Sequence, residues 1–158
     1  MSDAIVTPID ARRKLEAYCA YQERCHEEVV LKLRSLGQSQ DDIDTIVVYL
    51  INDNFLNEER FARSFARGKH RIKHWGKVRI VSELKARKIS QPNIKAALSE
   101  ITPEEYFDTF ESAADRHWLT IRESDLLKKK KKFCDYLLRK GFESQLVYAK
   151  LKELESRA

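Results

Sequence analysis

Apolar residues recur at the spacing of amphipathic α-helices along almost the whole chain. One stretch follows the i, i+3, i+4, i+7, i+8 pattern of a helix with a single buried face: Ile43, Ile46, Val47, Leu50 and Ile51. Similar stripes precede and follow it, and the breaks between them carry glycine, proline or a capping side chain. The pattern predicts an all-α protein of nine helices.

Local signals place many of the helix ends. Asn57 and Ser90 are expected to cap the fourth and sixth helices, and Thr102-Pro103-Glu104-Glu105 has the form of a capping box. Gly37 and Gly141 stand where a glycine usually ends a helix. The seventh helix is expected to bury Phe107, Phe110, Ala114, Trp118 and Ile121 on one face.

The nine stripes sort into three triplets that resemble one another. The alignment is anchored on Leu33, Leu84 and Leu137, spaced by about 50 residues as in helical solenoid repeats. It also brings one turn position of each triplet together: Gly37, Lys88 and Gly141. Amphipathic helices can be slid into agreement by chance, but the shared turn favours a true repeat.

The repeat predicts an elongated, curved tandem array of three three-helix units rather than one sphere. The expected units are 10–54, 55–101 and 102–158, after a disordered N-terminus, 1–9. Each unit is expected to bury its own stripe and to lean on its neighbours.

The composition fits this architecture. The 158 residues are 42% hydrophobic and 35% charged, with only four glycines and three prolines, too few for a β-sandwich or barrel. Cys19, Cys25 and Cys134 form an odd set without a CxxC pair, so we expect reduced, buried thiols. The chain starts without a secretory signal pattern and has no run of about 20 apolar residues, which favours a cytoplasmic protein.

The net charge of +5 is concentrated in the middle of the chain. Glu83 is the only acid between positions 60 and 88, so we expect an anionic partner to bind there, although a solvated helix face is the simpler alternative. The candidate binding residues are Arg60, Arg63, Arg67, Lys69, Arg71, Lys73, Lys77, Arg79, Arg87 and Lys88. A secondary cluster, equally consistent with binding or with a solvated helix turn, is Lys128, Lys129, Lys130, Lys131 and Lys132.

Motifs of catalysis are not found. The sequence has no P-loop, GxGxxG, HExxH or GxSxG pattern, so we predict a protein that is not an enzyme and uses no metal or other cofactor. His70 and His74 have metal-ligand spacing but no third ligand nearby in sequence. Asp41, Asp42 and Asp44 are better read as first-turn acids of a helix capped by Ser39 than as nuclease carboxylates.

The stretch from 52 to 90 resembles the RecX family of bacterial regulatory proteins. The matching residues are Phe55-Leu56, Asn57, Glu59, Arg60-Phe61-Ala62, Phe65, Lys69, Gly76, Arg79-Ile80 and Glu83-Leu84. The flanking EEVVLKLRSLG and KKFCDYLLRKGF agree with the family as well. One departure is Lys88, where the family usually has a glycine, so the second unit is expected to turn differently. The acidic run from Glu104 to Asp115 matches no family role.

The resemblance implies a modulator of the RecA recombinase in DNA repair, homologous recombination and the SOS response. The oligomeric state is left open by the sequence, but no heptad or long exposed apolar stripe demands a dimer, so a monomer is expected. Proteins of this family lie in the groove of the RecA–DNA filament and inhibit its ATP hydrolysis, strand exchange and co-protease activity, and some also bind DNA. The alternative is a helical protein that binds single- or double-stranded DNA through phosphate contacts, independently of RecA.

Overall fold

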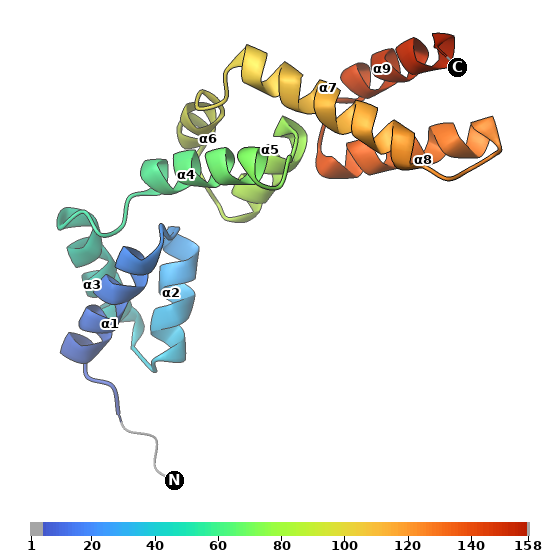
Figure 1. Cartoon of the computed structure of the whole chain (residues 1–158). Helices are drawn as coiled ribbons and strands as arrows, with labels where there is room; N and C mark the ends of the chain where they lie inside the picture. The colour runs from blue at the N-terminus through green and yellow to red at the C-terminus, as the bar shows by residue number, and fades with distance from the viewer. Residues whose placement is uncertain (1–4, 158) are drawn as a thin grey trace.

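The computed structural model describes residues 5–157, and these form nine α-helices and no strand. The first unit comprises α1 (Pro8–Tyr21), α2 (His26–Ser35) and α3 (Gln40–Asn52). The second comprises α4 (Glu58–Arg71), α5 (Lys77–Ala86) and α6 (Gln91–Leu98). The third comprises α7 (Pro103–Thr120), α8 (Leu126–Lys140) and α9 (Ser144–Ser156). The units follow one another along a curved body with the termini at opposite ends (Figure 1), which confirms the predicted fold class.

The helix ends follow the predicted capping chemistry. The side chains of Asn57, Ser90 and Thr102 each accept a hydrogen bond from a backbone N–H three residues further on, at 2.9, 3.4 and 3.1 Å. At the predicted capping box of Thr102, the Glu105 carboxylate is also bound to an arginine of another helix. α1 begins at Pro8, so the last two residues of the predicted disordered segment, 1–9, are helical, and 1–4 lie outside the described residues.

The repeat predicted from three aligned leucines is present in the backbone. Leu33, Leu84 and Leu137 are all fully buried. The three aligned turn residues, which follow α2, α5 and α8, share the left-handed backbone conformation. Their φ angles are +75° at Gly37, +60° at Lys88 and +99° at Gly141. The expectation that Lys88 would change the turn is therefore wrong: the lysine adopts the left-handed conformation, at a cost of about 1 kcal/mol relative to glycine.

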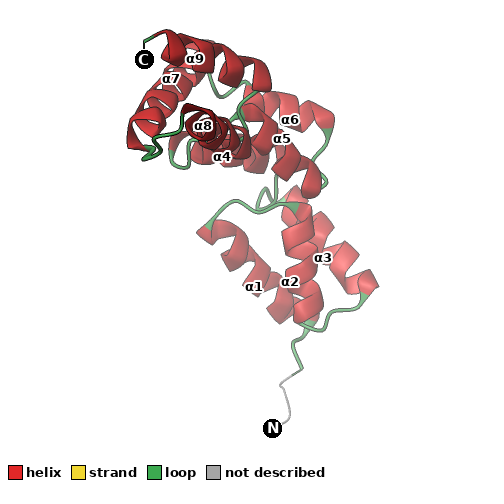
Figure 2. Ribbon diagram, turned by 90° about the vertical axis from the view of Figure 1, so that its right-hand side faces the viewer, coloured by secondary structure: helices red, strands yellow, loops and turns green. Residues whose placement is uncertain are grey.

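The core is divided differently from the prediction of one core per unit. The first unit has its own cluster around Leu15, Leu33 and Leu50. The second and third units share one continuous cluster, which includes Ile80 and Phe133 and also takes in Cys25, at the start of α2 in the first unit. Figure 2 shows the first unit set apart from the body formed by the other two. The molecule therefore consists of a two-unit body and one separately packed unit.

In addition to the shared core, two backbone hydrogen bonds join the second and third units. The Gly76 N–H donates to the Lys140 carbonyl at 2.8 Å, and the Val78 N–H donates to the Gly141 carbonyl at 2.9 Å. A Cβ placed on Gly76 would lie 2.3 Å from the Gly141 carbonyl carbon, so only glycine fits at this position. This contact fixes the start of α5 against the end of α8.

The buried face of α7 agrees with the predicted face except near the start of the helix, where Tyr106 is buried in place of Phe107. Tyr106, Phe110, Ala114 and Trp118 are buried, whereas Phe107 is 53% exposed. The ring of Tyr106 stacks on His70 at 5.3 Å between centroids and packs on Phe142 at 5.8 Å. Contacts with two other helices therefore decide which aromatic residue of this helix enters the core.

Candidate binding surface on the second unit

The predicted cationic stripe of α4 begins with Arg60, which bridges the first two units. Its Nε lies 2.6 Å from Oε1 of Glu23, which lies in the loop between α1 and α2 of the first unit. Its remaining guanidinium nitrogens donate to the Asn54 side chain and to the backbone carbonyls of Asn54 and Phe55. Because its donors are used inside the molecule, Arg60 acts as a link between units.

The next two arginines of the stripe share one acid. Arg63 Nη1 and Arg67 Nη1 both lie 3.1 Å from Oε1 of Glu100, just after α6, and Arg63 also pairs with Glu59. The hydrogen bond from Arg63 holds the pKa of Glu100 below its usual range. These pairs attach α4 to the end of α6, the helix it packs against.

The last arginine of the stripe reaches the acidic run that had no assigned role. Arg71 Nε lies 2.8 Å from Oε1 of Glu105 in the first turn of α7, and this hydrogen bond lowers the pKa of Glu105. Further along the same run, Glu111 and Asp115 bind the buried ammonium of Lys150 at 2.5 and 2.8 Å. Part of the acidic run therefore connects helices inside the array.

A cluster of cations on aromatic rings adjoins the stripe and has fewer acidic partners. The rings of Phe65 and Trp75 meet edge to face at 6.2 Å. Lys69 lies over both rings, at 5.5 and 4.9 Å from their centroids. Arg79 stacks on Trp75 at 4.0 Å, and Arg87 stacks on Phe65 at 4.8 Å. Half-exposed aromatic faces layered with cations are suited to contacts with bases or acidic side chains.

The start of α5 places cations against the helix dipole. Gly76 is the N-cap, Lys77 is the first helical residue, and the first turn contains no acid. Cations at a helix N-terminus typically cost about 0.3–1 kcal/mol, so a binding role would explain their presence. The Lys77 N–H donates to the Tyr106 hydroxyl at 3.0 Å, and that hydroxyl donates to Glu143 at 2.8 Å. The backbone of this corner is therefore held by the third unit.

The α4–α5 corner, defined as Lys69, Lys73, Lys77 and Arg79, is thus the least neutralised part of the predicted site. Among the described residues, none of these four cations has an ion-pair partner within 4.0 Å. The side chain of Lys73 is exposed, and its backbone carbonyl accepts a hydrogen bond from Lys140 at 3.1 Å. The four residues of the corner lie close together in the sequence, where α4 ends and α5 begins.

The secondary lysine cluster is divided between packing and solvent. Lys130 pairs with Glu155 at 2.5 Å, Lys132 pairs with Glu123 at 3.2 Å, and Lys129 lies 4.1 Å over the ring of Trp118. Lys128 and Lys131 are exposed and have no acid within 4.0 Å in the described part of the chain. Most of this run therefore covers its own unit.

Of the residues considered for metal or thiol chemistry, His70 and Cys25 are buried. His70 is fully buried and donates from Nδ1 to the Trp75 carbonyl at 2.9 Å, whereas His74 is exposed on the loop that follows α4. Burial raises the pKa of the Cys25 thiol to about 11. Within residues 5–157, no group of three His, Cys, Asp or Glu side chains is arranged to hold a metal ion.

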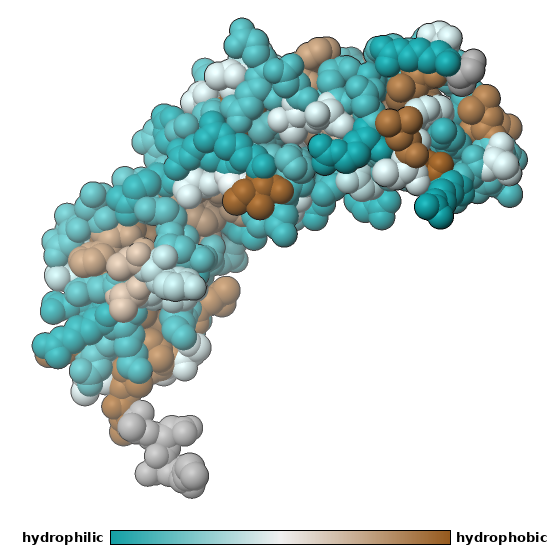
Figure 3. All heavy atoms as spheres, in the orientation of Figure 1, coloured by the Kyte–Doolittle hydropathy of each residue, from teal (hydrophilic) through white to brown (hydrophobic). Residues whose placement is uncertain are grey.

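Most of the surface seen in Figure 3 is hydrophilic, and hydrophobic residues gather near the outer end of the third unit. The exposed leucines of that end are Leu119, Leu126 and Leu127. None of the helices in the described residues is both long enough and apolar enough to span a bilayer.

Fold and surface together define a tandem array of three-helix units with a basic corner. Two family models match the chain: the second three-helix domain of RecX over residues 57–98, and the third over residues 104–151. The chain belongs to the RecX family of regulatory proteins.

Individual relatives agree with this assignment. The regulatory protein RecX of Prosthecochloris aestuarii is 28% identical over 153 residues, covering 92% of this chain and 95% of that protein. The one from Bacillus cytotoxicus is 26% identical over 139 residues, and the chain spans about half, 52%, of its length. The crystal structure of RecX from Lactobacillus salivarius superposes with a TM-score of 0.78 at 25% identity, covering 94% of this chain and 96% of that one.

Proposed function

We propose that this protein binds the RecA–DNA nucleoprotein filament in the cytoplasm and lowers the ATPase, recombination and co-protease activities of RecA. Membership in a family of regulatory proteins supports a regulatory role. The α4–α5 corner is the surface that we propose to contact the filament, because its cations have no acidic partners in the described residues and lie beside Phe65 and Trp75. The curved array is suited to following a filament groove.

Within this proposal, we expect the α4–α5 corner to make the contacts with the partner. Arg60, Arg63, Arg67 and Arg71 use their donors for acids of this chain, so they are expected to support the surface rather than to contact a partner. Reversing one of them would break a contact between helices as well as change the surface charge. Lys73 and Lys77 of the corner have no ion-pair partner in the described residues, so reversing them breaks no ion pair between helices, although the Lys77 ammonium lies 4.7 Å from the centre of the Tyr106 ring.

The test is the inhibition of RecA ATP hydrolysis on single-stranded DNA by a variant that carries Lys73→Glu and Lys77→Glu. Glutamate at position 77 suits the first turn of a helix, so folding should be retained. The matched control carries Lys95→Glu and Lys152→Glu, two exposed cations on α6 and α9 with the same change in net charge. We expect the corner variant to need about tenfold more protein for half inhibition, equivalent to about 1.4 kcal/mol. Inhibition equal to that by the control variant would contradict the proposal.

The second candidate is DNA binding without RecA, favoured by the stacked arrangement of Lys69, Arg79 and Trp75. Such binding would weaken steeply with salt, by about 0.9 in the logarithmic slope for each phosphate neutralised. Titrating the protein with bare DNA and with RecA-coated DNA at two salt concentrations separates the two functions. Equal affinity for both forms would support the second candidate.

A further inference from the structure

The two junctions between units are built from equivalent positions but from different residues. Gly76 and Cys25 are both the N-cap of the second helix in their unit, and they have the same offset as the aligned Leu84 and Leu33. Gly141 and Lys88 are the equivalent turn residues of the units that follow. The second junction, between the second and third units, brings Gly76 against Gly141. At the first junction, between the first and second units, the equivalent positions are Cys25 and Lys88.

Both positions of the first junction carry a Cβ, for which the glycine contact of the second junction has no room. In the described residues, no backbone hydrogen bond joins the segment around Cys25 to the turn around Lys88. The His26 N–H instead donates to Oε1 of Glu58 at 3.1 Å, and the His26 ring lies 3.5 Å from the same oxygen. The first junction thus relies on side chains and leaves a groove of about 370 Å³ beside this pair.

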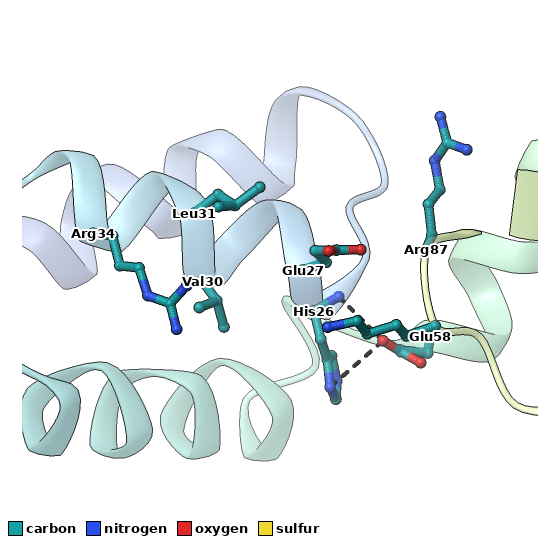
Figure 4. A pocket seen from close by; sticks show the side chains of 8 residues that line it. His26, Glu27, Val30, Leu31, Arg34, Glu58 and Arg87 are labelled. Atoms are coloured by element: carbon teal, nitrogen blue, oxygen red, sulfur yellow. Dashed lines mark hydrogen bonds and ion pairs between the residues drawn. The ribbon is translucent and has the colours of Figure 1, made fainter. Parts of the chain in front are cut away.

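The groove combines an apolar wall with cations. Val30 and Leu31 line it from α2, and Leu31 is 56% exposed. Figure 4 shows their side chains leaving α2 in different directions. Arg34, Arg87 and Lys88 also line it. Arg87 pairs only with Glu83 of its own helix, and no acid of the described chain lies within 4.0 Å of Arg34 or Lys88.

We infer that this groove between the first two units is a binding site for a protein segment in which an apolar side chain is flanked by carboxylates. The apolar residue would cover Val30 and Leu31, and the carboxylates would meet Arg34 and Lys88. A phosphate backbone fits less well, because it has no apolar side chain to cover Val30 and Leu31. Glu27 and Glu58 also line the groove, so the carboxylates of the segment must lie away from them, beside the cations. The site is separate from the α4–α5 corner and does not depend on RecA.

The probe for this site is a synthetic peptide, acetyl-Glu-Leu-Asp-Glu-Leu-Asp-amide, added to methyl-labelled protein and followed by NMR. We expect saturable shifts of the Val30 and Leu31 methyl resonances. A peptide with lysine at the four acidic positions should leave them unchanged. An oligo(dT) of equal charge should produce weaker shifts, and equal or stronger shifts would identify the groove as a nucleic-acid site and overturn the inference.

Two variants test the two halves of the groove. Leu31→Ser removes exposed apolar surface, and Lys88→Glu reverses a cation while keeping an equally unfavourable left-handed residue. Each is expected to weaken peptide binding at least fivefold without changing the helical circular dichroism spectrum. Lys85→Glu makes the same charge change on an exposed lysine outside the groove and should alter affinity less than twofold. Equal losses for Lys85→Glu and Lys88→Glu, or no methyl shift in the unmodified protein, would refute the site.

Discussion

Replacing Gly76 with alanine should destabilise the body formed by the second and third units by about 3 kcal/mol. The added Cβ would lie 2.3 Å from the carbonyl carbon and oxygen of Gly141 and 2.4 Å from the Phe142 nitrogen. These are backbone atoms, so the chain itself must move. The move stretches the hydrogen bonds from the Gly76 and Val78 N–H groups, each worth about 1 kcal/mol, and overpacking typically costs about 1–3 kcal/mol more.

Urea denaturation followed by tryptophan fluorescence isolates this effect. The two tryptophans, Trp75 and Trp118, both lie in the two-unit body, so the signal does not depend on the separately packed first unit. With a slope of about 2 kcal/mol per molar urea, the expected loss lowers the midpoint by about 1.5 M. Circular dichroism would include the first unit and should show a smaller fractional change.

Gly68→Ala is the matched control for the same substitution. Gly68 lies inside α4, and a Cβ there meets nothing within 4 Å. Alanine should therefore stabilise the helix by about 0.5–1 kcal/mol and raise the midpoint. A midpoint for Gly76→Ala at or above that of the unmodified protein would refute the claim that the backbone contact holds the two units together.

Two other changes test the turn and the ion pairs. Lys88→Gly should raise the free energy of unfolding by about 1 kcal/mol in the same urea assay, whereas Lys85→Gly, inside α5, should lower it by about as much. Glu100 and Glu105 have lowered pKa values, so the unfolded chain binds protons at higher pH than the folded one. Their stabilisation is therefore present above about pH 4.5 and is lost as the pH falls, and Glu100→Gln with Glu105→Gln should flatten that acid slope in urea midpoints measured from about pH 6 to 3.

The helices and their grouping could be predicted from sequence because the signals are local. Stripes such as the one from Ile43 to Leu50, caps such as Asn57, and glycines at left-handed turns depend on residues within a few positions of each other. The alignment predicted the turn position correctly even at Lys88, which adopts the left-handed conformation of the aligned glycines although lysine disfavours it. The one-position error on α7 arose because Phe107 and Tyr106 both fit a helical stripe beside Phe110.

The candidate binding surface was less predictable because its charge pairing depends on contacts between distant segments. The stripe from Arg60 to Arg71 has almost no acids near it in sequence, yet Glu23, Glu100 and Glu105 reach it in the fold. One signal was available: like charges repeated at helical spacing destabilise an isolated helix, so acids from elsewhere were a natural expectation. The acidic run that begins at Glu104 was an obvious source.

Stability and the proposed binding function meet at the junction between the second and third units. The hydrogen bonds from Gly76 and Val78 fix the residues on either side of them, and these include Trp75, Lys77 and Arg79. A corner held by backbone contacts presents its cations in one arrangement before a partner arrives, so less conformational entropy is lost on binding. The first junction has no such contact in the described residues, and its groove is lined by side chains. The glycine pair therefore holds the proposed binding corner by backbone contacts, whereas the first junction of the same repeated architecture is held by side chains.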